Sequence, residues 1–179
     1  MSLHAMIDLE TLGHTPNTVA LTIGGCKFDP NVITPSRDFF YYRFDVDEQL
    51  ERGRTTDDST LDWWASQPAD IRDEALGDQD RTPVKDVLEA LNKWCVNVEC
   101  IWAQGPAFDI VILEDMYRQY NHHYPWPFWK IRDCRTLFQI MPKDPRKELE
   151  FDAHNALEDC KAQALCVQQS LQQLGLTVR

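Results

Sequence analysis

Three apolar segments near the N-terminus, joined by short connections, constrain the fold of this 179-residue chain more than any other feature. They cover residues 3–9, 18–29 and 37–46, and each has the length and apolar content of a strand. A parallel pair of strands needs a crossover of a dozen or more residues, which these connections do not supply. The pattern therefore predicts an antiparallel meander of three strands.

Beyond residue 57 the sequence alternates between helical and strand patterns. Helices are predicted over 58–67, 84–96, 108–120, 134–141 and about 156–173, and strands over 99–104 and 129–134. Strands that are linked through helices pair in parallel. We therefore expect an α/β fold with the ribonuclease H-like layout: a mixed five-stranded sheet, with three antiparallel strands followed by two helix-linked strands, and helices on both faces.

The composition is that of a folded, acidic protein. Apolar residues make up 43% of the chain, which excludes disorder, and the length suits a single domain over residues 1–179. The formal net charge is −11. Because Lys and Arg contacts supply most non-specific affinity for nucleic acid, tight or processive binding of a strand is not expected. The negative charge also argues against a membrane surface, and no apolar stretch reaches the ~20 residues of a bilayer span.

The cysteines point to a reducing compartment. There are six of them, at positions 26, 95, 100, 134, 160 and 166, and none forms a CxxC pair. Cys95 and Cys100 are loosely spaced for a metal site, and no matching Cys or His pair lies nearby. Buried, reduced thiols fit this pattern. With no signal peptide recognisable at the N-terminus, we expect a cytoplasmic protein.

The first candidate site residues are Asp8 and Glu10, at the end of the first predicted strand. Residues two apart in a strand project to the same side, so both carboxylates would point into the crevice at the sheet edge. Two converging carboxylates repel each other, and bound cations are the simplest way to keep both ionised. The alternative is that Glu10 already lies in the loop and only Asp8 turns inward.

Asp109 is the second candidate, because it begins a helix directly after the strand predicted over 99–104. The alternative is an ordinary N-cap, a position that Asp favours. The third candidates are His154 and Asp159. Five residues on one helix would separate them by about 140°. Asn155, however, is a good N-cap, which leaves His154 outside the helix and free to approach Asp159. A loop histidine and a solvated helix charge are the alternatives.

Taken in order, these segments resemble three motifs of the DEDDh branch of the DEDD (DnaQ-like) 3′→5′ exonuclease superfamily. The segments are MIDLET, GPAFDIVIL and HNALEDCKAQA, and they lie at the start, middle and end of the chain. The intervening STLDWWASQ makes the chain most similar to the phage exodeoxyribonuclease A-like and ribonuclease T-like exonucleases. The resemblance spans nearly the whole chain.

The resemblance implies a two-metal hydrolase. It implies that two Mg²⁺ or Mn²⁺ ions are held by four carboxylates: Asp8, Glu10, Asp109 and Asp159. Oxygen-only ligands suit these hard ions and argue against zinc. His154 would take the proton of the attacking water, and the product would be a nucleoside 5′-monophosphate. The implied partners are single-stranded DNA or RNA 3′ ends in a bacterial or phage-infected cell, and a homodimer stays open.

The resemblance also suggests substrate contacts. Glu10 and the backbone of Thr11 and Leu12 would receive the terminal nucleotide, with the Leu12 side chain against its base. Many relatives carry Asn at the position of Gln104, so the way the penultimate phosphate is held is in doubt. The cations Lys143, Arg146 and Lys147 precede His154 and are candidates to face phosphate, although a solvated loop fits equally well.

Two tryptophans are further candidates for base contacts. Trp126 lies in a Pro-broken aromatic loop that could stack bases or cover the core. Trp63 and Trp64 are adjacent on a helix and therefore point about 100° apart, so that one is core and the other borders the substrate groove. We assign Trp64 and Trp126 to substrate.

Three functions stay open at this stage. The first is a 3′→5′ exonuclease acting on single-stranded or 3′-overhanging nucleic acid. The second is an oligoribonuclease-like phosphodiesterase acting on very short oligonucleotides, and the third is a non-catalytic binding module that keeps the fold. The residues do not choose between RNA and DNA, since that depends on contacts to the 2′-oxygen.

Overall fold

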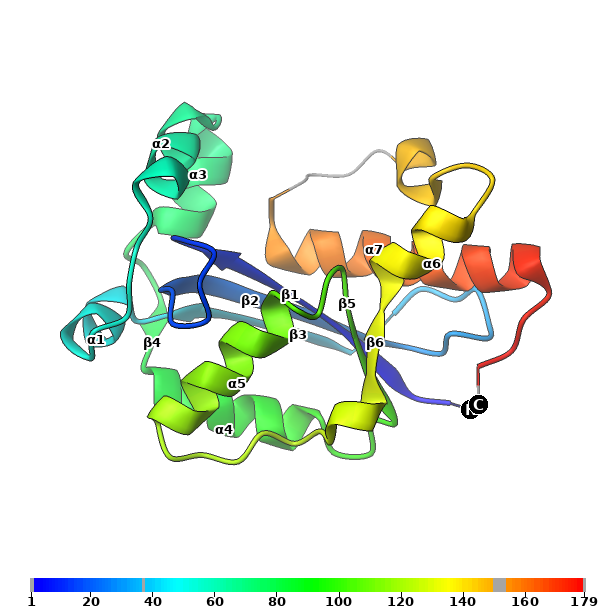
Figure 1. The fold of residues 1–179 in the computed structure, drawn as a ribbon, viewed down its shortest axis with the longest axis horizontal. Helices are drawn as coiled ribbons and strands as arrows, with labels where there is room; N and C mark the ends of the chain where they lie inside the picture. The colour runs from blue at the N-terminus through cyan, green and yellow to red at the C-terminus, as the bar shows by residue number, and fades with distance from the viewer. Residues whose placement is uncertain (1, 37, 150–153, 179) are drawn as a thin grey trace.

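The computed structural model describes residues 2–36, 38–149 and 154–178. Its centre is a six-stranded sheet with the order β4-β3-β2-β1-β5-β6 (Figure 1). The strands are β1 (His4–Thr11), β2 (Ala20–Phe28), β3 (Phe39–Phe44), β4 (Arg81–Thr82), β5 (Cys100–Ala103) and β6 (Ile131–Asp133). One position of the predicted strands, Arg37, lies outside the described residues.

The predicted mixed sheet is confirmed, with one additional strand. β1, β2 and β3 form the antiparallel meander, and β5 and β6 extend the sheet from β1 in parallel. The sixth strand, β4, pairs in parallel with β3 through Arg81 and Thr82. Two residues are too few to show a strand periodicity, and Thr82 next to Pro83 indicates only the start of a helix.

Helices cover both faces of the sheet, with α4 and α5 on one side and α6 and α7 on the other (Figure 1). The α-helices are α1 (Val46–Glu51), α2 (Asp58–Ser66), α3 (Ala69–Leu76), α4 (Val84–Trp94), α5 (Asp109–Gln119), α6 (Cys134–Ile140) and α7 (Ala156–Leu174). Short 3₁₀ turns occur at η1 (Phe128–Lys130) and η2 (Pro145–Glu148). The sequence patterns did not predict α1 and α3, which are short. No helix in the described ranges is long and apolar enough to cross a bilayer.

Side-chain alternation along β1 decides which residues face which helices. Ile7 and Leu9 are buried in the apolar core that includes residues of α4 and α5, whereas Met6 is buried in the core formed with α6 and α7. Asp8 and Glu10 follow Met6 at intervals of two residues, so they lie on the α6–α7 side of the sheet.

A glycine in β2 lets α7 approach this side of the sheet. Gly24 pairs with Asp8 across the β1–β2 ladder. A Cβ added at Gly24 would lie 2.2 Å from the backbone of Ala156, so only glycine allows the first turn of α7 to rest there. Asp159 is the fourth residue of α7, at the end of its first turn. The close contact at Gly24 therefore brings Asp159 beside Asp8. The Gly24–Gly25 pair marks close packing, while the irregularity in the ladder falls between Glu10 and Thr11.

Candidate active site

A cavity of about 330 Å³ opens at the rim of the sheet where β1, β5, α5 and α7 meet. It brings together all five residues that the sequence motifs single out, although they are up to 151 positions apart in the chain (8 to 159). The lining residues are Asp8, Leu9, Glu10, Gln104, Phe108, Asp109, Arg135, Arg146, His154, Asp159, Ala162 and Gln163.

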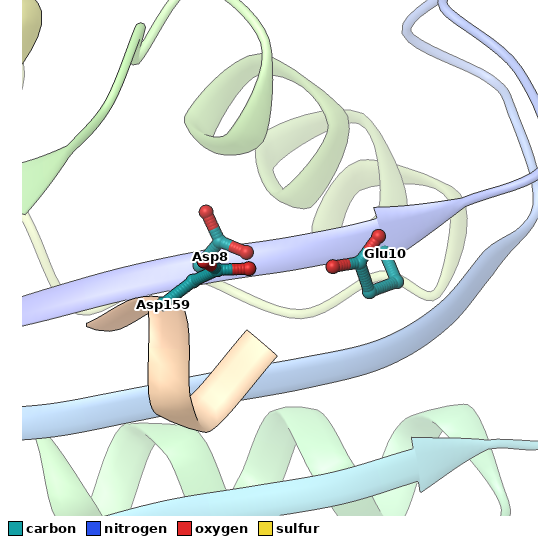
Figure 2. A group of neighbouring side chains, drawn as sticks. All are labelled: Asp8, Glu10 and Asp159. Carbon is teal, nitrogen blue, oxygen red and sulfur yellow. The ribbon is translucent and has the colours of Figure 1, made fainter. Parts of the chain in front are cut away.

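Asp8, Glu10 and Asp159 form the centre of this cavity. One carboxylate oxygen of each lies within 4.8 Å of an oxygen of the other two. Figure 2 shows Asp8 and Glu10 projecting from β1 toward Asp159 of α7. Because β1 continues to Thr11, Glu10 lies in the strand and not in the loop, and it shares the side of Asp8.

Asp109 approaches the same cavity from the other helix layer. It is the first residue of α5, and only 3% of its surface is exposed. Its Oδ1 accepts a hydrogen bond of 3.0 Å from the backbone N–H of Leu9, which lies between Asp8 and Glu10. The N-cap position of α5 belongs to Phe108, whose side chain makes no capping bond. Asp109 is therefore bonded to β1 and is not the N-cap of its helix.

His154 lies just before α7, as its neighbour Asn155 predicts. Asn155 caps the helix by accepting from the backbone N–H groups of Leu157 and Glu158. His154 has a left-handed backbone with φ of 71°, and its N–H donates to Oδ2 of Asp159 at 3.0 Å. Its ring meets the ring of Trp63 edge-on, with centroids 4.9 Å apart. The left-handed turn therefore holds the imidazole at the rim of the cavity.

Burial disfavours the ionised forms of all four carboxylates, and mutual repulsion adds to this for Asp8 and Glu10. Burial, followed by the charges of Asp109, Glu10 and Asp159, raises the pKa of Asp8 well above its usual value. Burial and the charge of Asp159 raise the pKa of Glu10 to about 9. Burial raises the pKa of Asp109 to about 7 and that of Asp159 to about 6, despite the backbone bonds that each accepts. The described residues therefore compensate these anions only in part: the charge of Arg135 lowers the pKa of Asp109 but does not offset the effect of burial.

The donor set fits divalent cations. None of the four carboxylates forms an ion pair with a described Lys or Arg. Apart from the two backbone donors, the one side-chain donor among the described residues is the amide of Gln163, whose Nε2 lies 3.2 Å from Oδ1 of Asp8. Clustered oxygen ligands with raised pKa values are the environment that Mg²⁺ or Mn²⁺ would neutralise.

A second, more apolar hollow of about 380 Å³ adjoins the carboxylates. It shares Leu9, Glu10 and Phe108 with the carboxylate cavity. Its remaining lining residues are Thr11, His14, Ser59, Thr60, Trp63 and Trp64. We call this space the aromatic hollow. Its size and its flat aromatic walls suit a nucleobase.

Of the two adjacent tryptophans, Trp63 and not Trp64 is the exposed one, which is the reverse of the assignment made from the sequence. Trp64 is only 2% exposed, and its Nε1–H donates to the carbonyl of Thr11 at 2.9 Å, so it forms a buried wall of the aromatic hollow. Trp63, which is 39% exposed, is the partner that offers a free face. The periodicity of the sequence required one inward and one outward residue but did not decide which.

Trp126 and Leu12 are also buried. Trp126 is 3% exposed, packs against Tyr117 and Tyr124, and donates from Nε1 to Glu114 at 3.2 Å. Assigning Trp126 to base stacking is therefore wrong, because neither face of its ring is accessible. Leu12 is 6% exposed in a cluster with Trp64, and it is not among the residues that line the aromatic hollow.

Of the polar residues predicted to contact phosphate, two line the carboxylate cavity and two do not. Gln104 lines the carboxylate cavity, as does Arg146, whereas Lys143 and Lys147 do not. Several lining residues were not singled out for a role in the sequence analysis: Trp63, His14, Phe108, Arg135 and Gln163. For Gln163 a signal existed, since it lies four residues after Asp159 and therefore on the same helix face.

A ribonuclease H-like sheet with four carboxylates and a histidine at one rim defines the class of DEDDh nucleases. The sequence profile described as "3'-5' exoribonuclease Rv2179c-like domain" matches residues 3–171, and the chain belongs to this family. It is a 3′→5′ exonuclease by this membership, and use of divalent metal is general in the family.

Known proteins resemble the chain over most of its length. An exodeoxyribonuclease of Enterobacteria phage T4 is 25% identical over 201 aligned positions, which cover 93% of this chain and 88% of the phage protein. The nuclease domain of 3′hExo, a DEDDh family member bound to rAMP, superposes with a TM-score of 0.65 at 15% identity, covering 99% of this chain and 95% of that domain.

A third relative is larger. The zinc-bound form of the E. coli exonuclease I complex with single-stranded DNA has a TM-score of 0.61 at 13% identity. The alignment covers 98% of this chain but 41% of that protein. At these identities the solved structures establish the shared fold.

Proposed function

We propose that this exonuclease releases nucleoside 5′-monophosphates from single-stranded 3′ ends by two-metal-ion hydrolysis. The proposal rests on one observation: four carboxylates and a histidine from β1, α5 and the start of α7 line one cavity, which opens into an aromatic hollow. The proposed ligands of Mg²⁺ or Mn²⁺ are Asp8, Glu10, Asp109 and Asp159. When bound, the cations would stabilise charge on the scissile phosphate and favour ionisation of a bound water.

His154 is the proposed general base. It lies at the cavity rim outside the helix, and the edge of Trp63 limits the positions of its ring. The bond from its backbone N–H to Asp159 couples the base to a proposed metal ligand. A neutral imidazole in this position takes the proton of the attacking water, and hydroxide then adds to phosphorus as the 3′-oxygen leaves.

The aromatic hollow is the proposed site of the 3′-terminal nucleotide. It lies on the Glu10 and Thr11 side of the carboxylates, and the exposed face of Trp63 can contact the base. Because the flat walls contact the face of the base and not its edge, we expect tolerance of different bases.

The family is described as exoribonucleases and the phage relative as an exodeoxyribonuclease, so the sugar preference needs a direct test. Six buried thiols support a reducing compartment such as the cytoplasm.

Digestion of a 5′-labelled single-stranded 20-mer in Mn²⁺ tests the mechanism. The wild-type protein should shorten it stepwise from the 3′ end. Asp8→Asn and His154→Ala should each lower kcat/KM by at least about a hundredfold, because a ligand charge or a general base is lost. The matched controls are Glu158→Gln, which neutralises the partly exposed carboxylate next to Asp159, and His123→Ala. Wild-type rates in both test variants would exclude the proposed roles.

Substrate length and sugar are decided in the same assay. Matched RNA and DNA strands, each as a dinucleotide and as a 20-mer, separate an exonuclease of long strands from an oligoribonuclease-like enzyme. Preference for the dinucleotide by more than tenfold in kcat/KM would favour the second candidate.

A further inference from the structure

Arg135 stands out among the cavity residues because it brings a cation to an acidic site. It is the second residue of α6, directly after β6, and its side chain lines the carboxylate cavity. It does not line the aromatic hollow. Arg135 therefore lies on the side of the carboxylates away from the proposed terminal-nucleotide site.

Arg135 is an exposed residue whose guanidinium rests on one side against the turn between β5 and α5. Its Nη2 donates to the backbone carbonyl of Gln104 at 2.9 Å. Gly105 has φ of +101°, and a Cβ built there would lie 3.5 Å from Nη2 of Arg135. The β5–α5 turn thus offers one acceptor and a bare backbone surface against the guanidinium, which has five N–H donors in total. Among the described residues, no other acceptor is bonded to this guanidinium.

The two arginines of the cavity differ in their partners. Arg146 is neutralised by Asp144, whose oxygens lie 2.6 Å from its Nη2 and 2.9 Å from its Nε. Arg135 forms no ion pair with any described residue. In a protein of net charge −11, an arginine beside four carboxylates that is not ion-paired with a described residue indicates an anionic ligand.

The segment that borders the aromatic hollow is strongly acidic, in contrast to the positive charge of Arg135. The segment 57–80, which contains α2 and α3, supplies hollow residues Ser59, Thr60, Trp63 and Trp64. It contains eight acidic residues and one basic residue, Arg72; the acidic ones are Asp57, Asp58, Asp62, Asp70, Asp73, Glu74, Asp78 and Asp80. A polyanionic strand is repelled from this side, so its body should leave the cavity past Arg135.

We propose that Arg135 binds the phosphate on the 5′ side of the scissile linkage, which is the second linkage from the 3′ end. This assignment rests on the proposed function, since it takes the terminal nucleotide to occupy the aromatic hollow. The guanidinium would orient the strand by two hydrogen bonds to that phosphate, while Gln104 and Gly105 hold it from behind.

A chemical double-mutant cycle tests the contact. Two single-stranded oligonucleotides each carry one neutral methylphosphonate, either at the second or at the eighth linkage from the 3′ end. The rate of the first cleavage is measured as kcat/KM for the wild-type protein and for Arg135→Gln. On the fully charged strand, Arg135→Gln should be slower by tenfold or more, as for loss of a charge-assisted hydrogen bond.

The decisive quantity is the coupling between the two changes. A neutral second linkage should lower kcat/KM of the wild-type protein by a similar factor and should lower that of Arg135→Gln no further. A neutral eighth linkage should change kcat/KM of neither protein. Arg135→Lys should recover part of the rate. Arg118→Gln, which removes a 63%-exposed side chain, serves as the matched control for lost positive charge.

The contact is refuted if the two losses multiply, or if Arg135→Gln cleaves at the wild-type rate. Circular dichroism melting verifies that Arg135→Gln is folded. If the wild-type protein cleaves nothing, the proposed function fails; the same cycle measured by fluorescence anisotropy of oligonucleotide binding then still tests Arg135. Equal affinities of wild type and Arg135→Gln for the fully charged strand would reject it in that case.

Discussion

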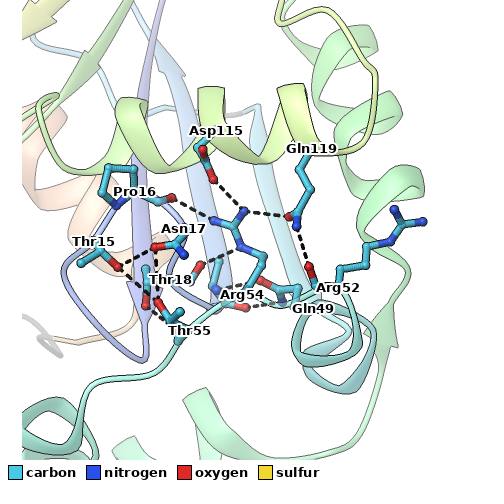
Figure 3. Close-up of polar contacts among 11 residues, drawn as sticks. Thr15, Pro16, Asn17, Thr18, Gln49, Arg52, Arg54, Thr55, Asp115 and Gln119 are labelled. Atoms are coloured by element: carbon cyan, nitrogen blue, oxygen red, sulfur yellow. Dashed lines mark hydrogen bonds and ion pairs between the residues drawn. The ribbon is translucent and has the colours of Figure 1, made fainter.

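Two clusters of charged side chains in this protein, one around the buried Arg54 and one around the partly buried carboxylates of the cavity, are built in opposite ways. In the first, the side chain of Arg54 is completely buried and fully surrounded by acceptors (Figure 3). Its guanidinium donates to the carbonyls of Thr18 and Pro16 at 2.8 and 3.0 Å, to Asp115 at 3.0 Å and to Gln119 at 3.1 Å. This network ties the loop after β1 to α5.

In the second cluster the carboxylates have few partners among the residues that the structure describes. Asp8, Glu10, Asp109 and Asp159 share two backbone donors and one glutamine amide, and all four have raised pKa values. A buried charge whose partners are complete serves the fold, whereas one whose partners are missing is suited to bind an ion. The loop held by Arg54 includes His14 of the aromatic hollow, so the first cluster supports the second.

Removal of Arg54 should give the largest loss of stability. Arg54→Met leaves buried carbonyls without donors and Asp115 without its cation, and we expect the free energy of unfolding to fall by about 3 kcal/mol. Urea unfolding measures this. Arg118→Met, which breaks an exposed pair with Glu114, should change it by less than about 1 kcal/mol. If the two variants lowered the free energy of unfolding equally, the buried network of Arg54 would contribute no more to stability than a pair at the surface.

Neutralising a carboxylate should act in the opposite direction on the metal-free protein. Asp8 is ionised in the unfolded chain at pH 8, whereas burial and the neighbouring carboxylates disfavour its anion in the folded protein. Asp8→Asn removes this cost of folding, so in a chelator at pH 8 the melting temperature should rise, corresponding to about 1 kcal/mol. The same variant should lose most of the additional stabilisation that Mn²⁺ gives the wild-type protein.

Glu158→Gln is the control: Glu158 pairs with Lys161 at the surface, and although its charge contributes to the raised pKa of Asp159, its removal should change both quantities much less than Asp8→Asn does. Destabilisation of the metal-free protein by Asp8→Asn would mean that Asp8 is compensated in the fold, as Arg54 is.

The stability of the metal-free protein should depend on pH because the cavity carboxylates have raised pKa values. These carboxylates bind protons more tightly in the folded state, so their contribution to stability is complete below the unfolded pKa values near 4 and is lost as pH rises. The loss should pass through the folded pKa values of Asp159 and Asp109, about 6 and about 7, and end near that of Glu10, about 9.

Chemical unfolding in a chelator from pH 4 to pH 9 should therefore show a decrease of about 2 kcal/mol, since local relaxation relieves part of the repulsion. Asp109→Asn should flatten the curve below pH 7, and Mn²⁺ should reverse the slope by displacing protons. A wild-type curve that is flat without metal would contradict the raised pKa values.

Local patterns predicted most of the fold because they depend on neighbours in the chain. The meander, the start of α4 after Pro83 and the cap at Asn155 are all confirmed. The sequence patterns missed β4, α1 and α3, since elements of two to eight residues show too little periodicity to be distinguished from loops. The convergence of the five motif residues was predicted from the resemblance to the DEDDh motifs, because position alone left another interpretation open for each of them, and the structure places all five around one cavity.

The tertiary structure alone decided which side chains are accessible and which charges are paired. Trp64 and Trp126 are buried while Trp63 is open, and Arg135 has no described ion-pair partner while Arg146 has one. A sequence determines where a side chain leaves the backbone, so the chain by itself specified the carboxylates, their order and the element that carries each. Exposure and charge compensation depend on segments that are distant in sequence, such as α2 beside β1, and exist only once those segments pack.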